Sequence, residues 1–253
     1  MSWTKGGAKL QLKIGHLYPD LLDLYSDRGN VIILEKRAHW RGLQVTVDQI
    51  SVGHEPRLAD YDILVMGGGM DREQGIVAED LQQRRENLQE AVDAGTVIVA
   101  ICGGYQLLGH YFETSTGQRI PGLGILDIVT VGAKVRMVGN VVGEMDIAGV
   151  KHNIIGYENH SGKTMLGPNA TPMMRVIKGY GNSGEDKFEG VRQGNIFGTY
   201  LHGPLLAKNP ILADHMIELA LRRRDLSVHL DILNDDLEHR TNAKLYKRLV
   251  EAK

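Results

Sequence analysis

A single cysteine, Cys102, stands where two contrasting stretches of sequence meet. Before it, residues 97–101 form a continuous, mostly β-branched apolar run, as expected of a strand buried on both faces. After it, Tyr105 and Leu108 have a spacing that suits the buried side of a helix. A thiol on the sharp turn between such elements lies near the positive end of the helix, which favours the reactive thiolate. The pattern therefore predicts a nucleophile.

The alternative is that Cys102 is a small buried hydrophobic residue at the end of an apolar strand. The neighbouring sequence favours the catalytic interpretation, because it reads small-x-Cys-Gly-Gly-x-Gln, from Ala100 to Gln106. Gly103 and Gly104 let a substrate approach the backbone closely and leave N–H groups free to face an oxyanion. The predicted chemistry is attack by sulfur on a carbonyl group.

A run of three glycines follows another apolar strand. Gly67, Gly68 and Gly69 come directly after the run at residues 62–66 and form either a tight turn or a backbone cradle. They are not a phosphate-binding P-loop, because no Gly-Lys-Ser/Thr sequence follows. Ligands bind at the carboxyl ends of parallel strands. We therefore expect an oxyanion hole built from the N–H groups of Gly68, Gly69 and Gly103.

Two further segments carry polar and ionisable side chains. Residues 195–201 read as a strand that ends at His202, after which Gly-Pro turns the chain away. A lone histidine is more often structural, but beside a cysteine on another strand end His202 is a candidate general base. The other segment, Gly-Tyr-Glu-Asn-His at residues 156–160, is a weak signal alone, since structural loops have a similar composition.

Two other patterns are excluded as sites. Residues 179–184 match Gly-x-Gly-x-x-Gly, but a dinucleotide-binding motif must open a helix, and the next residues have no helical periodicity. We therefore expect a hairpin loop there. The ten histidines form no compact His-x-x-x-His or Cys-x-x-Cys pattern, so no metal site is predicted.

The composition is that of an ordinary globular protein, with 253 residues, 42% apolar residues and a formal net charge of −2. This near-neutral charge does not indicate a nucleic-acid-binding protein. The arginines at 222–224 are interpreted as the solvent-exposed end of a helix. One cysteine excludes an internal disulfide and fits a reducing compartment. No apolar run approaches the roughly 20 residues that span a bilayer, and residues 1–9 do not resemble a signal peptide. We therefore expect a cytoplasmic protein that does not insert into the membrane.

Strands and helices that must position these residues alternate along the first part of the chain. The expected strands are residues 10–17, 44–52, 62–66 and 97–101, and the expected helices are 31–41, capped by Asn30, and 79–94. This alternation predicts an open, mostly parallel α/β sheet with helices on both faces. Short β-like pieces from about residue 119 to residue 200 predict antiparallel extensions, and the chain reads as helical again after residue 210.

Four segments together resemble the class I (triad-type) glutamine amidotransferases of the cobyric-acid-synthase-like group. They are residues 67–69, 102–106, 156–160 and 200–203, and the resemblance covers about residues 10–220. It implies a flavodoxin-like fold, with residues 1–9 as an N-terminal extension, 10–222 as the amidotransferase domain and 223–253 as a helical tail. Ala100 stands where the first glycine of the family's nucleophile motif usually lies.

Three more pieces resemble the GatD family, the glutaminase subunits of lipid II isoglutaminyl synthase. They are Leu-Tyr-Ser-Asp-Arg-Gly-Asn, Gly-Gly-Gly-Met-Asp-Arg-Glu-Gln and Glu-Asn-His-Ser-Gly-Lys-Thr. The resemblance implies L-glutamine as substrate and a heterodimer with a MurT-type, Mur-ligase-like synthetase. That partner would use ATP and magnesium to amidate the D-glutamate of the membrane-bound acceptor lipid II, and no cofactor is implied for this chain.

The resemblance assigns roles to individual residues. Cys102 is the nucleophile and His202 its base, in a hydrolysis that passes through a thioester. Arg136 falls where the family holds glutamine, and its guanidinium suits the α-carboxylate. The rest of the expected substrate-binding set is Gln106, Tyr157, Glu158, Asn159 and His160.

One position departs from the wider class. Pro204 stands where triad amidotransferases usually have a glutamate, so His202 lacks its expected orienting acid. The resemblance implies that the partner supplies this acid and that activity depends on the partner, while Glu158 is a candidate within the chain. Three alternatives stay open: a regulatory or scaffold subunit, a glutaminase for another amide synthetase such as a cobyrinate-amidating enzyme, and another flavodoxin-like cysteine hydrolase. The last would not explain Gly-Tyr-Glu-Asn-His.

Overall fold

The computed structural model describes residues 4–5, 8–9 and 11–251, and a six-stranded sheet lies at its centre. Five of its strands are parallel, in the order β14 (Ile196–Thr199), β6 (Val97–Ile101), β5 (Ile63–Met66), β3 (Gln11–Leu17) and β4 (Gln44–Ile50). The sixth, β13 (Val191–Gln193), is antiparallel to β14. Every residue of β5 and β6 is buried, which explains their unbroken apolar sequence. Residue 10, the expected start of the first strand, lies outside the described residues.

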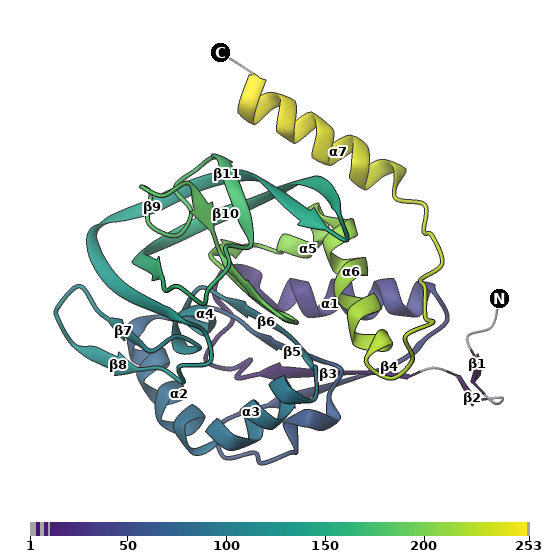
Figure 1. Ribbon diagram of the computed structural model, residues 1–253, viewed down its shortest axis with the longest axis horizontal. Helices are drawn as coiled ribbons and strands as arrows, with labels where there is room; N and C mark the ends of the chain where they lie inside the picture. Colours follow the sequence, from purple (N-terminus) through teal and green to yellow (C-terminus); the bar gives the residue numbers. More distant parts are fainter. Residues whose placement is uncertain (1–3, 6–7, 10, 252–253) are drawn as a thin grey trace.

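Helices cover both faces of this sheet (Figure 1). On one face lie α1 (Arg28–Trp40) and α6 (Pro210–Arg222), which pack against each other. On the other lie α2 (Asp71–Gln83) and α3 (Arg85–Asp93), while the short α4 (Gly103–Leu107) follows β6 directly. The prediction of an open, mostly parallel α/β sheet with helices on both faces is confirmed.

The boundaries of two expected helices were wrong. The first helix begins at Arg28, and Asn30 lies inside it, where its side-chain oxygen accepts a hydrogen bond from the N–H of Leu206 instead of capping the helix. The helix expected over residues 79–94 is two helices, which meet at Arg84. The Arg84 side chain is buried and donates to Asp80 and to the backbone carbonyls of Ser51 and His54, in the loop after β4. These contacts hold the break, and local periodicity does not report them.

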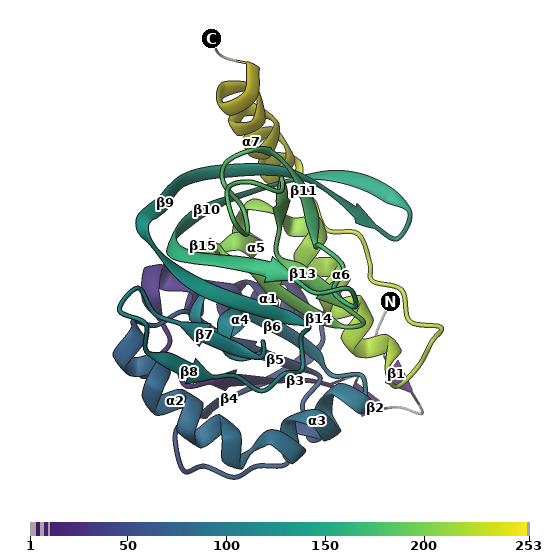
Figure 2. The ribbon, with the colours of Figure 1, turned by 60° about the vertical axis from the view of Figure 1, so that its left-hand side comes forward.

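A second sheet, of seven strands, arches over the α1 and α6 side of the molecule (Figure 2). The sequence predicted short β-like pieces here, but the sheet is built on two long strands, β9 (Ile128–Ile147) and β10 (Val150–Leu166). The two strands pair antiparallel, with a bulge between His160 and Gly162. Glycines at 132, 139, 143, 156 and 162 interrupt the strand pattern of both, which explains the error. The other strands are β7 (Tyr111–Glu113), β8 (Arg119–Pro121), β11 (Met174–Lys178), β12 (Phe188–Glu189) and β15 (Leu201–His202).

The hairpin loop expected at residues 179–184 is confirmed, because this segment joins the antiparallel strands β11 and β12. The remaining elements are short: β1 (Thr4–Lys5), β2 (Ala8–Lys9), η1 (Leu24–Ser26), η2 (Leu58–Asp60) and α5 (Leu205–Lys208). Beyond α6 the chain runs to α7 (Asp236–Tyr246) and a π-helical turn (Lys247–Glu251), which lie along the outer side of the second sheet. Within the described residues, no helix combines the length and apolar character needed to cross a bilayer.

Candidate active site

Cys102 joins β6 to α4 in a backbone conformation that side-chain-bearing residues rarely adopt, with φ 49° and ψ −106°. Its N–H donates a hydrogen bond to the carbonyl of Thr199 on β14, and its own carbonyl accepts one from the N–H of Gln106. These two bonds fix the strained turn between strand and helix. Cys102 is 8% exposed and lines a cavity. The predicted position thus has the backbone geometry and the access expected of a nucleophile turn.

The ring of His202 is buried beside Cys102, although 100 residues separate the two in sequence. A Cβ atom built on Gly68 would lie 3.0 Å from both the Cβ of Cys102 and the Cε1 of His202. The two side chains therefore meet at the Gly68 backbone, where a larger residue would press against both. The Nε2 atom of His202 makes no hydrogen bond to another described residue, which leaves it to face the thiol.

The other ring nitrogen of His202 contacts a carboxylate of the same chain. Its Nδ1 atom lies 3.1 and 3.0 Å from Oδ1 and Oδ2 of Asp27, whose side chain is buried. The resemblance implied that a partner subunit would supply this acid, with Glu158 as a candidate within the chain. The structure places Asp27 at the position of the orienting acid in a Cys-His-Asp triad.

A sequence signal for Asp27 was present. It lies in Leu-Tyr-Ser-Asp-Arg-Gly-Asn, one of the segments that carried the family resemblance, and this segment follows the first strand of the parallel sheet. The carboxyl ends of parallel strands share one edge of the sheet, so a buried acid after β3 belongs near Cys102.

Asp27 also fixes the glycine loop that follows β5. The N–H of Gly68 donates to Asp27 Oδ2 at 2.9 Å, and the carbonyl of Gly68 accepts from the N–H of Leu24 at 3.1 Å. The amide of Gly68 is therefore engaged. The N–H of Gly69 has no acceptor among the described residues, and that of Gly103 begins α4, where no helical carbonyl reaches it. These last two amides are the ones available to an oxyanion.

The pKa of His202 is shifted upward. Burial of the ring alone would lower the pKa, but the hydrogen bond with Asp27 and the electrostatic interaction with Cys102 outweigh burial and raise the pKa of His202 to about 10. At neutral pH the ring then holds a proton that it can transfer to a leaving group.

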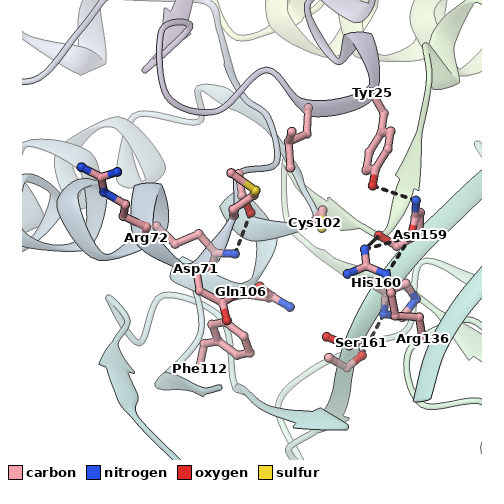
Figure 3. Close-up of a pocket in the computed structure, with 15 residues that line it drawn as sticks. Tyr25, Asp71, Arg72, Cys102, Gln106, Phe112, Arg136, Asn159, His160 and Ser161 are labelled. Carbon is pink, nitrogen blue, oxygen red and sulfur yellow. Dashed lines mark hydrogen bonds between the residues drawn. The ribbon is translucent and has the colours of Figure 1, made fainter. Parts of the chain in front are cut away.

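A cavity of about 530 Å³ opens beside Cys102 (Figure 3). Tyr25, Asn159 and Arg136 form one wall, where the Asn159 amide donates to the Tyr25 hydroxyl at 2.7 Å. The guanidinium of Arg136 donates to the side-chain oxygen of Asn159 at 2.8 and 3.0 Å. Asp71 and Arg72, at the start of α2, line the opposite side.

Four of the predicted substrate-binding residues line this cavity: Arg136, Gln106, Asn159 and His160. The structure places Glu158 and Tyr157 outside the lining. Glu158 is completely buried and accepts hydrogen bonds from the N–H groups of Tyr180 and Gly181. Tyr157 lies opposite His202 in the antiparallel pair of β10 and β15. Its backbone therefore helps to hold the histidine in position.

A buried hydrogen-bond network holds two of the lining residues in place. The ring of His160 stacks on Tyr200 with 3.6 Å between centroids, and its Nδ1 atom lies 2.8 Å from the carbonyl oxygen of Gly162. The Tyr200 hydroxyl accepts from Nε2 of Gln106 at 3.1 Å and contacts Thr164 at 2.6 Å. Neither side chain is free to swing out of the cavity wall.

The polar groups of the cavity suit an organic, amino-acid-sized ligand. Within the part of the chain that the structure describes, no group of three or more His, Cys, Asp or Glu side chains could hold a metal ion. The cavity instead offers a guanidinium that can bind a carboxylate, carboxamides that can bind an amide, and a thiol that can attack an electrophilic carbon.

The fold and this site define a triad-type amidotransferase. Residues 13–210 match the CobB/CobQ-like glutamine amidotransferase domain, and the chain belongs to this family. A solved structure titled as a glutamine amidotransferase has the same fold, with a TM-score of 0.53, 18% identity, and coverage of 82% of this chain and 98% of that chain.

Over nearly its whole length the chain is similar to GatD subunits of the glutamine-hydrolysing lipid II isoglutaminyl synthase. The subunit of Streptococcus pneumoniae is 36% identical, over 94% of this chain and 93% of that protein. The subunit of Staphylococcus aureus is 38% identical, over 94% of this chain and 96% of that protein. The family resemblance inferred from the motifs is confirmed.

Proposed function

We propose that the chain is a glutaminase subunit of a lipid II isoglutaminyl synthase and hydrolyses L-glutamine to glutamate and ammonia. The observation that carries this proposal is the buried set Cys102, His202 and Asp27 at the edge of a cavity large enough to admit an amino acid. The similarity to GatD subunits over 94% of the chain supports it.

The first half of the reaction forms a thioester. The thiolate of Cys102 attacks the side-chain amide carbon of glutamine, and the charge that develops on the amide oxygen is stabilised by the N–H groups of Gly69 and Gly103. His202 gives its Nε2 proton to the amide nitrogen, the C–N bond breaks and ammonia leaves. Asp27 keeps the ring oriented and stabilises its positive charge.

The second half releases glutamate. His202, now neutral, takes a proton from water, and the resulting hydroxide attacks the thioester carbon. The C–S bond breaks, glutamate leaves, and the thiolate and protonated imidazole are restored. Arg136 holds the α-carboxylate through both halves, because its guanidinium is fixed by Asn159 on the cavity wall and remains exposed.

Ammonia then passes to a MurT-type, Mur-ligase-like synthetase. This partner binds ATP and magnesium and amidates the D-glutamate of the lipid II stem peptide to D-isoglutamine. We expect both subunits to work in the cytoplasm. The two GatD relatives support this assignment, since each is one subunit of a glutamine-hydrolysing synthase. Because Asp27 belongs to this chain, we expect some glutaminase activity without the partner.

The test is glutamate release from glutamine, measured for the chain alone and with the synthetase, each against Cys102→Ala. We expect release that disappears with the substitution and rises when the synthetase is added. No Cys102-dependent release in either mixture would refute the glutaminase assignment. The regulatory-subunit alternative rested on a missing acid, and the contact between Asp27 and His202 removes that basis.

A further inference from the structure

His202 follows a corner at which the chain leaves one sheet and joins the other. β14 ends at Thr199 in the parallel sheet, and β15 begins at Leu201 in the second sheet. Two N–H groups at this corner donate to side chains. Tyr200 donates to Oε1 of Glu189 at 2.7 Å, and Leu201 donates to Oγ1 of Thr199 at 3.0 Å. Side chains therefore help to hold the corner that delivers the histidine.

The same corner is bonded to the nucleophile. The carbonyl of Thr199 accepts a hydrogen bond from the N–H of Cys102 at 2.8 Å, and His202 lies three positions further along the chain. A shift of the corner would therefore move the imidazole relative to the sulfur. A displacement of about 1 Å in an active site can lower a rate by about 100-fold.

Glu189, on β12, places a completely buried carboxyl group at this corner. Its two oxygens lie 2.9 and 3.0 Å from Oγ1 of Thr199. The charged group that acts on it is another buried carboxyl, that of Glu158 on β10, and the phenol of Tyr105 on α4 also interacts with it. Among the described residues, no cationic side chain balances a charge on Glu189.

The hydrogen bonds indicate that this carboxyl group carries a proton. The hydroxyl of Thr199 has one proton, so it can donate to only one of the two oxygens of Glu189. Oε1 also receives the N–H of Tyr200, whereas Oε2 contacts no other donor in the described part of the chain. A proton on Oε2 can be donated to Oγ1 of Thr199, which pairs every polar atom of the corner. A charged Oε2 would instead stay buried without a donor of its own, which is costly.

The electrostatic surroundings favour the same neutral form. Burial, which is the largest effect, and the charge of Glu158 raise the pKa of Glu189 to about 8, against the opposing hydrogen bonds from Tyr200 and Thr199. The carboxyl group is therefore mostly neutral at pH 7 and ionises as the pH rises through about 8.

We propose that Glu189, held neutral, is a positioning residue for the hydrolysis, which together with the Thr199 hydroxyl fixes the corner between β14 and β15 and keeps His202 aligned with Cys102. This inference rests on the proposed glutaminase function. Glu189 does not line the cavity, so it acts through the corner and not on the substrate. Ionisation removes the proton that joins it to Thr199 and loosens the corner.

The first experiment compares kcat for glutamate release by wild type and Glu189→Gln at pH 7 and pH 9. The amide keeps the shape of the neutral acid, since its oxygen can accept from Tyr200 and its NH₂ can donate to Thr199, and it does not ionise. We expect rates within about twofold of each other at pH 7. At pH 9 about a tenth of the wild-type carboxyl groups remain neutral, so Glu189→Gln should be about tenfold faster. A large loss at pH 7, or an equal rate at both pH values, would overturn the proposal.

Removing the hydroxyl tests the other half of the Glu189–Thr199 pair. Thr199→Val keeps the shape of the side chain, and we expect kcat to fall about 10- to 100-fold with little change in KM. Thr199→Ser, which keeps the hydroxyl, should recover most of the rate. Thr96→Val is the matched control, because Thr96 is equally buried and its hydroxyl bonds at the opposite end of β6. It should lower stability and leave kcat unchanged. Equal losses of kcat in Thr199→Val and Thr96→Val would overturn the proposal.

A chemical probe separates this inference from the proposed function. Cys102 is the only cysteine, so its alkylation by iodoacetamide can be followed by mass spectrometry without any turnover. We expect alkylation several times slower in Thr199→Val than in wild type or Thr96→Val, because the sulfur loses its alignment with His202. If the wild-type chain released no glutamate, the proposed function would fail, yet this difference would still support the positioning role. Equal alkylation rates in the three proteins would contradict it.

Discussion

Asp27 contacts both His202 and the glycine loop at residues 67–69. One of its oxygens accepts from the N–H of Gly68, and both oxygens lie within about hydrogen-bond distance of Nδ1 of His202. A single buried carboxylate thus sets the orientation of the base and the position of the glycine loop. The two residues that precede it, Tyr25 and Ser26, both have positive φ, at 54° and 64°. Such conformations persist where the surrounding structure enforces them, as at active sites.

We expect Asp27→Asn to lower kcat for glutamate release by about 10²- to 10⁴-fold, because the amide neither stabilises protonated His202 nor selects its tautomer. Glutamate release under saturating glutamine measures this. Asp23→Asn is the matched control, since Asp23 is exposed in the same loop and asparagine keeps an oxygen for the N–H of Arg28. A rate within twofold of wild type for Asp27→Asn would exclude Asp27 from the triad.

The raised pKa of His202 also predicts how stability depends on pH. The ordinary value is 6.5 and the folded value is about 10, so protonation of this ring stabilises the folded state. The contribution is complete below about pH 6.5 and is lost as the pH rises toward 10. Urea unfolding at pH 6.5 and pH 10 should therefore show a smaller decline for Asp27→Asn than for wild type. Parallel declines would contradict the assignment.

At the scale of elements, the site is assembled where three parallel strands end. β3 leads to the loop of Asp27, β5 to Gly67–Gly69, and β6 to Cys102, while β15 delivers His202 from the second sheet. The loops are tied to one another, since the N–H of Gly104 donates to the carbonyl of Gly67. The spacing of strands in a sheet, about 4.8 Å, brings these ends within reach of one substrate.

Two glycine substitutions test this arrangement. Gly68→Ala places a Cβ 3.0 Å from both Cys102 and His202, so we expect glutamate release to fall at least about tenfold. Gly75→Ala, inside α2, meets nothing within 4 Å and should stabilise the protein by about 0.5–1 kcal/mol with unchanged activity. Glutamate release and urea unfolding of each variant provide the measurements. Normal activity of Gly68→Ala would mean that the two side chains do not meet at this residue.

At the scale of the molecule, a buried arginine ties the C-terminal segment to the amidotransferase body. The guanidinium of Arg37, on α1, is 3% exposed and binds Asp214 of α6 and Asp235 at the start of α7, each through two nitrogen–oxygen contacts of 2.6–2.8 Å. Arg41 adds a further bond to Asp214. Within the segment between α6 and α7, Val228 is buried in the core and the carbonyl of Asp231 accepts a hydrogen bond from Arg41, while Leu226 and Ile232 are exposed.

Removing the charge of Asp235 should loosen this segment. We expect Asp235→Asn to cost roughly 1.5–3 kcal/mol locally, the usual range for a hydrogen bond to a charged group. Trypsin should then cleave after Arg224 several times faster, as followed by mass spectrometry. Asp231→Asn, whose side chain is exposed, is the control. Equal cleavage rates in the two variants would show that Arg37 does not hold the segment.

The sequence by itself determined the features that depend on neighbouring residues. The change from a β-branched run to a helical spacing at Cys102, with two glycines after it, predicted the nucleophile turn. The strand ending at His202 before Gly-Pro predicted a histidine beside the cysteine, and the alternation of apolar segments predicted the parallel sheet. These signals are local because a strand or a helix is specified over a few consecutive residues.

The tertiary structure alone decided the features that depend on distant residues. The contact between Asp27 and His202 joins positions 175 residues apart, so nothing near His202 could reveal its acid. The break at Arg84 likewise depends on partners in a loop about 30 residues earlier in the chain. Packing brings such groups together only after the sheet has formed. Asp27, in the turn before α1, then lies against the buried ring of His202.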